Sequence, residues 1–222
     1  LSSCDYTDLS PIDSITDKTY WTTTNDLKLY ANGLYGLLAS PTATGDNTSD
    51  NFVPKDYSGY LFNEYTVPAS ASSSNGWYWN DIRSCNYFLQ RYQTVEGSEA
   101  EINKYVAEIR FMRGLLYYSK IKQFGDVPWY DKVLGSDDAD LYKARDSREF
   151  VMEKVMEDLN FAIEVFKETN RTKELYRVTW WTAQALKSRV GLFEGTYRKY
   201  HGLGDYEKYL NDCVSASNEI MT

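Results

Sequence analysis

SEAEINKYVAEIRFMRGLLYYSKIKQFGDVP, residues 98–128, carries apolar side chains spaced three and four residues apart, the pattern of a helix with one wide buried face. Ser98 and Glu101 form a capping-box pair at its start, Gly125 suits a left-handed C-terminal cap, and Pro128 prevents continuation. The pattern predicts a helix of about 26 residues, roughly 39 Å long. Other helices must pack on its apolar stripe, formed by Ile102, Tyr105, Val106, Ile109, Met112, Leu116, Tyr117, Ile121 and Phe124.

Charged residues also lie within this stretch. Arg113 is near the predicted buried side, and Glu108 and Arg110 are close to it on the helix. Long arginine stems cover apolar surface well. We therefore expect these side chains to form salt bridges that contribute to packing rather than to chemistry.

Five further stretches show amphipathic spacing or helix-start signals, beginning near Thr23, Trp77, Asp146, Thr179 and Asp205. No stretch has a convincing strand pattern, so the chain is predicted to be all-α with six helices. The predicted inward positions include Leu27, Tyr30, Ala31, Leu34, Tyr35, Leu38, Tyr78, Ile82, Cys85, Leu89, Tyr92, Val151, Val155, Leu159, Ala162, Ile163, Phe166, Tyr206, Tyr209, Leu210, Cys213, Ala216 and Ile220.

Two local signals concern how these helices start and pack. Asp146 and Glu149 form a predicted capping pair. Thr179 is a predicted N-cap, and the small residues Ala183 and Ala185 allow close contact with a neighbouring helix. From Ile102 onward the helices are expected to form two helix–turn–helix pairs.

Composition excludes several classes of function. The chain has 222 residues, 42% of them hydrophobic, which suffices for a sizeable core. Its net charge of −8 argues against nucleic acid or an anionic lipid surface as a partner. With one histidine, three scattered cysteines and no HxxH or CxxC spacing, no metal site is predicted. No cofactor motif is recognisable, because Gly202 and Gly204 follow no strand and mark a turn.

Residues 39–76 are polar and aperiodic, which is typical of a long surface loop, and aromatic residues continue just beyond it. Exposed rings there can stack on pyranose faces, while amide side chains bond to hydroxyl groups. Packing beneath the loop is the alternative for the tryptophans. The candidate ligand-binding residues are Trp77, Trp79, Tyr57, Tyr60 and Asn80.

AEIRFMRGLLYYSKIKQFGDVPW, residues 107–129, resembles the run AEARFLRAYYYFDLVRLFGDVPL that is typical of the SusD/RagB family of outer-membrane nutrient-binding lipoproteins in Bacteroidetes. LSPIDSIT at 9–16 and YRVTWWTAQALKSRVGLFEG at 176–195 resemble two further family segments. The chain departs from the family at Trp180 and Trp181, which replace small or polar residues. Each indole must pack on a neighbouring helix or stand out as a contact surface.

The resemblance implies an α-solenoid-like superhelix of antiparallel, tetratricopeptide-like helix pairs with long irregular loops. We expect a leader or tether over residues 1–22 and a single helical domain over residues 23–222. Family members are roughly twice this length, so the resemblance implies that the C-terminal half is absent.

Leu1-Ser2-Ser3-Cys4 resembles the end of a bacterial lipobox, in which signal cleavage leaves a cysteine that becomes lipidated. Cys4 is therefore the expected lipid attachment site, and an ordinary free or bonded cysteine is the alternative. The expected location is the outer membrane at the cell surface, with a lipid anchor. Elsewhere, Cys85 is expected to be a buried inert thiol, and a disulfide to Cys213 is the alternative.

The resemblance implies a glycan-binding lipoprotein that captures oligosaccharides and delivers them to a TonB-dependent SusC-like transporter. The alternatives are a helical-repeat scaffold for proteins and a peptide-binding member of the RagB type. An enzyme is not expected: no pair of carboxylates lies in a recognisable catalytic motif, and no Ser–His or Cys–His pattern is present.

Overall fold

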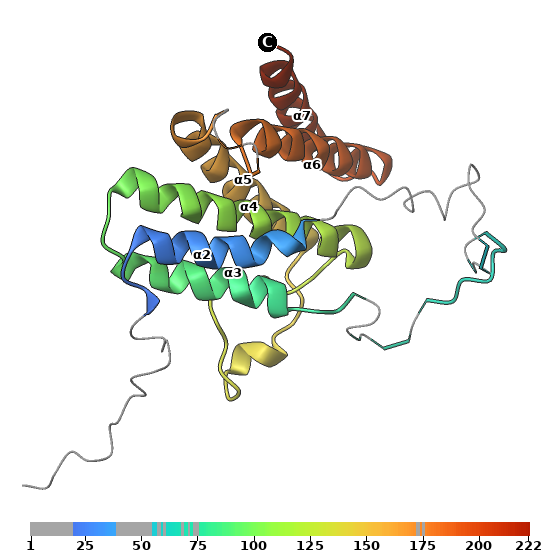
Figure 1. Cartoon of the computed structure of the whole chain (residues 1–222). Coiled ribbons are helices and arrows are strands. Elements are labelled where there is room, and N and C mark those ends of the chain that lie inside the picture. The colour runs from blue at the N-terminus through green and yellow to red at the C-terminus, as the bar shows by residue number, and fades with distance from the viewer. Residues whose placement is uncertain are drawn as a thin grey trace, which may run out of the picture.

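The computed structural model describes residues 20–38, 55–56, 59, 61–67, 69–70, 72, 76–171, 174 and 176–222. Within them, the regular structure is helical, which confirms the predicted all-α class (Figure 1). The α-helices are α2 (Thr24–Leu34), α3 (Asn80–Arg91), α4 (Glu99–Phe124), α5 (Arg148–Thr169), α6 (Trp180–Tyr200) and α7 (Tyr206–Met221). Short 3₁₀-helices follow at η1 (Tyr35–Leu37), η4 (Tyr92–Thr94) and η5 (Ala139–Tyr142).

Helix α4 is the axis of the fold, as its sequence predicts. It contains 26 residues, and the hydroxyl of the N-cap Ser98 accepts the Glu101 N–H at 3.3 Å. At the other end Gly125 has φ 71°, a conformation that only glycine adopts without strain, and its N–H bonds the Ile121 carbonyl.

The predicted helix pairs are present: α5 packs along α4, and α7 packs along α6 (Figure 1). Helices α2 and α3 pack against α4 as well, and in the figure they lie away from α7. The continuous core thus formed includes the buried side chains of Leu27, Ile82, Phe88, Ile109, Met112, Ile121, Met152, Leu159 and Phe166. No helix of the described chain is at once long and apolar enough to cross a bilayer.

A buried ionic cluster joins α3, α4 and α5. The Arg113 guanidinium donates from Nε and Nη2 to the Asp158 carboxylate at 2.7 and 2.9 Å, and from Nη1 to Asn86 Oδ1 at 3.0 Å. Arg110 Nε donates to the same carboxylate at 2.7 Å. Asp158 is 1% exposed, so this cluster is part of the core. The expectation of salt-bridged packing at α4 is confirmed.

A second buried carboxylate ties α4 to the start of α6. Glu108 accepts Arg177 Nε at 2.7 Å and Nη2 at 2.6 Å, while Arg177 Nη1 reaches Asn32 Oδ1 on α2 at 2.6 Å. A third, Glu194 on α6, accepts from Arg148 and Arg198. Each buried carboxylate therefore has at least one guanidinium partner, which offsets part of the cost of its desolvation.

Helices α6 and α7 approach closely at two glycines. A Cβ at Gly191 would stand 2.6 Å from the Tyr209 carbonyl and 2.9 Å from the Cys213 amide, and one at Gly195 would stand 2.7 Å from the Leu210 side chain. Ala183 is buried as predicted, but Ala185 is exposed. The prediction that Ala185 supports close helix contact is therefore wrong.

Three other local predictions are wrong. Ile220, expected on the buried face of α7, is 36% exposed. Helix α5 is capped by Ser147, whose hydroxyl accepts the Phe150 N–H at 3.3 Å, and not by Asp146. Asp146 instead accepts the Trp129 N–H and the Lys143 ammonium group, each at 2.7 Å. Tyr78 precedes the start of α3 and is 42% exposed, so it does not belong to that helix's buried face.

The structure also decides between the alternatives for Cys85 and for Trp180. Cys85 and Cys213 are both free thiols. Cys85 is fully buried, and burial raises its pKa to about 12, so it is inert as expected. Trp180 is 2% exposed and packs edge-to-face with the half-buried Trp181 at a centroid distance of 4.7 Å.

Candidate functional site

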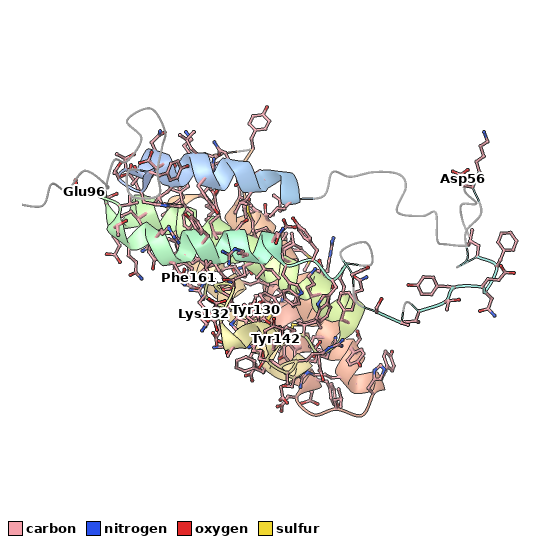
Figure 2. All side chains as sticks on the ribbon, turned by 90° about the horizontal axis from the view of Figure 1, so that it is seen from below. Asp56, Glu96, Tyr130, Lys132, Tyr142 and Phe161 are labelled. Atoms are coloured by element: carbon pink, nitrogen blue, oxygen red, sulfur yellow. The ribbon has the colours of Figure 1, made fainter. Side chains whose placement is uncertain are left out.

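Between α4 and α5 the chain forms the connector, residues 125–147, which is fastened at both ends. Val127 and Asp146 form an isolated antiparallel bridge, and the Asp126 carboxylate accepts the N–H of Arg148 at 2.7 Å. Tyr130, Lys132 and Tyr142 lie together on this side of the molecule (Figure 2). The connector is therefore held in a defined position between α4 and α5 at both of its ends.

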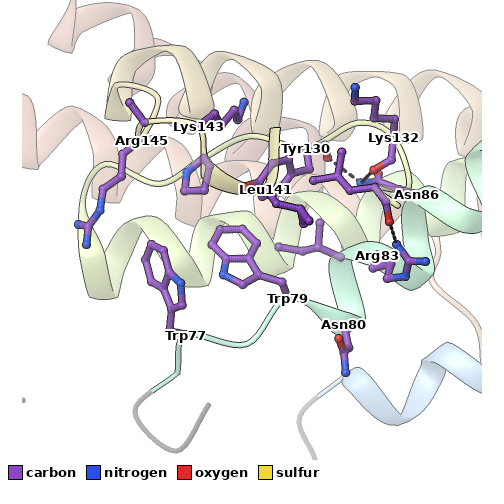
Figure 3. A pocket seen from close by; sticks show the side chains of 14 residues that line it. Trp77, Trp79, Asn80, Arg83, Asn86, Tyr130, Lys132, Leu141, Lys143 and Arg145 are labelled. Atoms are coloured by element: carbon purple, nitrogen blue, oxygen red, sulfur yellow. Dashed lines mark hydrogen bonds between the residues drawn. The ribbon is translucent and has the colours of Figure 1, made fainter. Parts of the chain in front are cut away.

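A pocket of about 500 Å³ lies between the connector and the start of α3 (Figure 3). We call it the aromatic pocket. It is lined by Trp77, Trp79, Asn80, Ile82, Arg83, Asn86, Pro128, Tyr130, Lys132, Leu134, Leu141, Lys143, Ala144 and Arg145.

The two indoles form one side of this pocket while also packing on α4. The Trp77 and Trp79 rings meet edge-to-face at 5.2 Å, Trp77 meets Phe124 at 5.0 Å, and Trp79 meets Tyr130 at 5.6 Å. Both tryptophans are partly buried. The two alternatives for these residues were stacking on a ligand and packing beneath the loop. They are compatible, because each ring is held by its packing contacts and also lines the pocket.

The far wall is tied to the ionic cluster of the core. Asn86 Nδ2 donates to the Tyr130 carbonyl at 2.7 Å, while Asn86 Oδ1 accepts from Arg113. The buried hydroxyl of Tyr117 accepts the Tyr130 N–H at 2.6 Å and donates to its carbonyl at 3.2 Å. Burial raises the pKa of Tyr117 well above its usual value, so this hydroxyl stays protonated.

Cations surround the pocket. Arg83 Nη1 donates to the Leu134 carbonyl at 2.6 Å, and the Arg145 guanidinium lies 4.9 Å from the centre of the Trp77 ring. Lys143 bonds the Trp129 carbonyl and Asp146. Beneath the indoles Lys120 lies 5.5 Å from the Trp79 ring, and burial lowers its pKa.

This arrangement is suited to binding. Flat rings offer apolar faces for sugar rings, and Asn80 and the guanidinium groups offer hydrogen-bond donors at the rim. The described residues that line the pocket include no carboxylate. In the described part of the chain, no group of histidine, cysteine, aspartate and glutamate is placed to hold a metal ion.

Three of the candidate ligand-binding residues, Trp77, Trp79 and Asn80, line the pocket together. Tyr57, Tyr60 and the predicted lipid site Cys4 lie outside the described residues. Sequence reasoning missed the connector side of the pocket, formed by Tyr130, Leu141, Lys143 and Arg145, together with Arg83 on α3. The clustering of aromatic and basic residues between Trp129 and Arg145 was the available signal.

Similar proteins share this helical frame. SusD-like protein P38 of Formosa agariphila is 23% identical over 209 residues, covering 89% of this chain and 40% of that protein. A SusD-like protein of Bacteroides fragilis superposes with a TM-score of 0.68 at 24% identity, covering 96% of this chain and 41% of its own. A laminarin-binding SusD-like protein superposes with a TM-score of 0.64 at 15% identity, covering 90% and 44%. The chain thus spans about two fifths of the length of these relatives.

A match to a protein family also covers most of the chain. The SusD-like family, described as "Starch-binding associating with outer membrane", matches residues 8–192, which include α2 to α5 and more than half of α6. Because this match covers most of its length, the chain belongs to the SusD-like family.

Proposed function

We propose that this protein captures oligosaccharides in the aromatic pocket and delivers them to a TonB-dependent, SusC-like transporter. The observation that carries the proposal is the convergence of Trp77, Trp79 and Tyr130 on one pocket whose rim provides hydrogen-bond donors. Rings held by packing lose little freedom when a sugar stacks on them, which favours binding. Glycoside hydrolysis needs two carboxylates, and the described residues that line the pocket include none, so we propose binding rather than cleavage.

The proposal includes attachment to the outer membrane through a lipid on Cys4, at the end of a tether over residues 1–22. Several acyl chains would make that attachment close to permanent. The domain of residues 23–222 would then stand at the cell surface, where a transporter is within reach. Intact-mass measurement of the native protein tests the lipid, and co-purification with a SusC-like transporter from detergent-solubilised outer membranes tests the partner.

Binding is tested with the double variant Trp77→Ala/Trp79→Ala, titrated by calorimetry against the oligosaccharides that bind best on a glycan array, laminarin fragments included. We expect affinity to fall by about 100-fold or more, because each lost stacking contact contributes about 1–3 kcal/mol by analogy with base stacking. Trp181→Ala is the matched control, since that indole is also half-buried and lies on α6. Unchanged affinity in the double variant, with helicity intact by circular dichroism, would assign both rings to packing alone.

A further inference from the structure

We propose that the aromatic pocket selects acidic glycans, with Arg83 and Arg145 binding a carboxylate or sulfate group on a sugar that stacks on the indoles. This inference rests on the proposed function and adds the chemical class of the ligand. The family description names starch, a neutral glucan, so the proposal departs from it on the evidence of this chain's own residues.

The charge of the lining is the first observation. Four described residues that line the pocket carry a full charge, and all four are cationic: Arg83, Lys132, Lys143 and Arg145. The chain as a whole carries a net charge of −8. A cationic pocket in an acidic protein attracts anionic ligands to that place and away from the rest of the surface.

The four cations differ in how they are paired. Lys132 forms salt bridges with Asp140 at 2.7 Å and Asp138 at 3.4 Å, and Lys143 pairs with Asp146 at 2.7 Å. These ammonium groups are already compensated by the connector's own carboxylates. The two lysines stabilise the connector and add little net positive charge to the pocket.

The two arginines have no salt bridge to a carboxylate within the described part of the chain. Arg83 donates to the Leu134 carbonyl and Arg145 to the Asp126 carbonyl at 3.5 Å, so both bond to neutral backbone. The nearby Asp126 carboxylate is bound to the Arg148 N–H instead. Because a guanidinium has five N–H donors, both arginines keep donors for a ligand.

The positions of the arginines fit a glycan better than a small anion. Figure 3 shows Arg145 beside Trp77 at one end of the pocket and Arg83 at the other, with Trp79 and Leu141 between them. The Arg145 guanidinium lies over the Trp77 ring, 4.9 Å from its centre, so an anionic group bound to Arg145 would be held next to that ring. Guanidinium groups bind carboxylate and sulfate oxygens with two parallel hydrogen bonds, which are stronger than bonds to hydroxyl groups.

The test compares matched probes that differ in charge alone. Oligogalacturonates are titrated against their methyl esters, and sulfated galactan oligosaccharides against their desulfated forms. We expect at least one acidic probe to bind at least tenfold tighter than its neutral partner. Its affinity should fall on raising NaCl from about 0.05 to about 0.5 M, because exposed charges are screened. The probe that binds identifies carboxylate or sulfate as the group recognised.

Variants assign the effect to the two arginines. Arg83→Gln and Arg145→Gln should each weaken binding of the acidic probe about tenfold, the loss of one hydrogen bond to a charged group, and weaken binding of the neutral probe by clearly less, so that the preference for the acidic probe falls. Arg83→Lys keeps the charge and controls for disturbance of the connector. Arg91→Gln is a control on the same helix, since Arg91 stacks on Tyr87 at 3.6 Å and does not line the pocket.

The outcomes separate the inference from the proposed function. Equal binding of acidic and neutral probes, or unchanged affinity in both glutamine variants, would overturn the acidic selectivity and leave glycan capture standing. Failure to bind any glycan on the array would overturn both.

Discussion

The two helix pairs of this protein are held together by opposite means. At the α4–α5 interface large charged side chains meet in the core, where Arg113 and Arg110 share the Asp158 carboxylate. At the α6–α7 interface two glycines, Gly191 and Gly195, have no Cβ, and this lets the two backbones approach closely. The same packing arrangement can therefore be built by satisfying buried charge or by removing Cβ atoms.

The difference has a functional side. The ionic interface continues through Asn86 to the Tyr130 carbonyl, so it supports a wall of the aromatic pocket. The glycine interface joins α6 to α7, neither of which supplies a residue to the pocket lining. We infer that a change at the α4–α5 interface disturbs the pocket wall more than a change at the α6–α7 interface does.

The largest effect is expected at the centre of the ionic cluster. Asp158→Ala removes the carboxylate and leaves the buried Arg113 without its anionic partner, which should lower the free energy of unfolding by about 3–5 kcal/mol. Urea denaturation followed by circular dichroism measures it. Glu157→Ala, next in sequence but exposed and paired with Lys154, should change stability by less than about 0.5 kcal/mol. Equal losses in both variants would refute a special role for the cluster.

Asn86→Ala tests whether the ionic interface reaches the pocket. It leaves the Arg113 Nη1 donor without Asn86 and removes one of the donors to the Tyr130 carbonyl, which Tyr117 still bonds, at a cost of about 2–3 kcal/mol. Glycan affinity should also fall, because Tyr130 loses part of its support. Stability is measured by urea denaturation and affinity by calorimetry. Lower stability with unchanged glycan affinity would show that the pocket does not depend on the ionic cluster.

Gly191→Ala tests the other interface. The new methyl group would meet the Tyr209 carbonyl, and the helices must separate, so we expect a loss of about 2 kcal/mol. Glycan affinity should not change. Gly114→Ala on α4 is the matched control: its Cβ would meet the Leu159 side chain at an ordinary 3.5 Å, and the change should be neutral or stabilising by up to about 1 kcal/mol. A stabilising Gly191→Ala together with a destabilising Gly114→Ala would contradict the role given to glycine at the α6–α7 interface.

The smallest effect lies outside both interfaces and sets the scale for the others. Partial burial raises the pKa of Asp26, but hydrogen bonds from Thr23 and Thr22 outweigh it and hold that pKa below its usual 3.8. Its contribution is therefore complete above pH 3.8 and is lost as pH falls through the lower folded-state value. Asp26→Asn should lower stability by less than about 1 kcal/mol near pH 6, and the difference should shrink near pH 2. A difference independent of pH would exclude this carboxylate as the source.

Much of the frame follows from local sequence signals. The start and end of α4, the caps at Thr23 and Thr179 and the buried face of α5 all depend on residues within one or two turns of each other. The Asp146 cap was wrong for a tertiary reason, since the Trp129 N–H and Lys143 compete for that carboxylate. A helix-start pattern cannot report a partner from another segment.

The pocket was half predictable for the same reason. Trp77, Trp79 and Asn80 are neighbours in sequence and were found together, whereas Tyr130 and Arg145 reach them only after the connector folds back on α3. The close helix contact at Gly191 was not predicted. Without knowledge of the neighbouring helix, a glycine inside a helix indicates only a lower helix propensity. Its value appears only when the Tyr209 backbone lies against it.

The placement of two thiols gives the molecule its own reporters of local opening. Cys85 sits at 0% exposure on α3, next to the pocket residue Asn86, whereas the partly buried Cys213 lies on α7 against Gly191. Neither end of the molecule needs an introduced label. The rates at which an alkylating reagent modifies the two sulfur atoms should report local opening near the pocket and local opening at the α6–α7 interface separately.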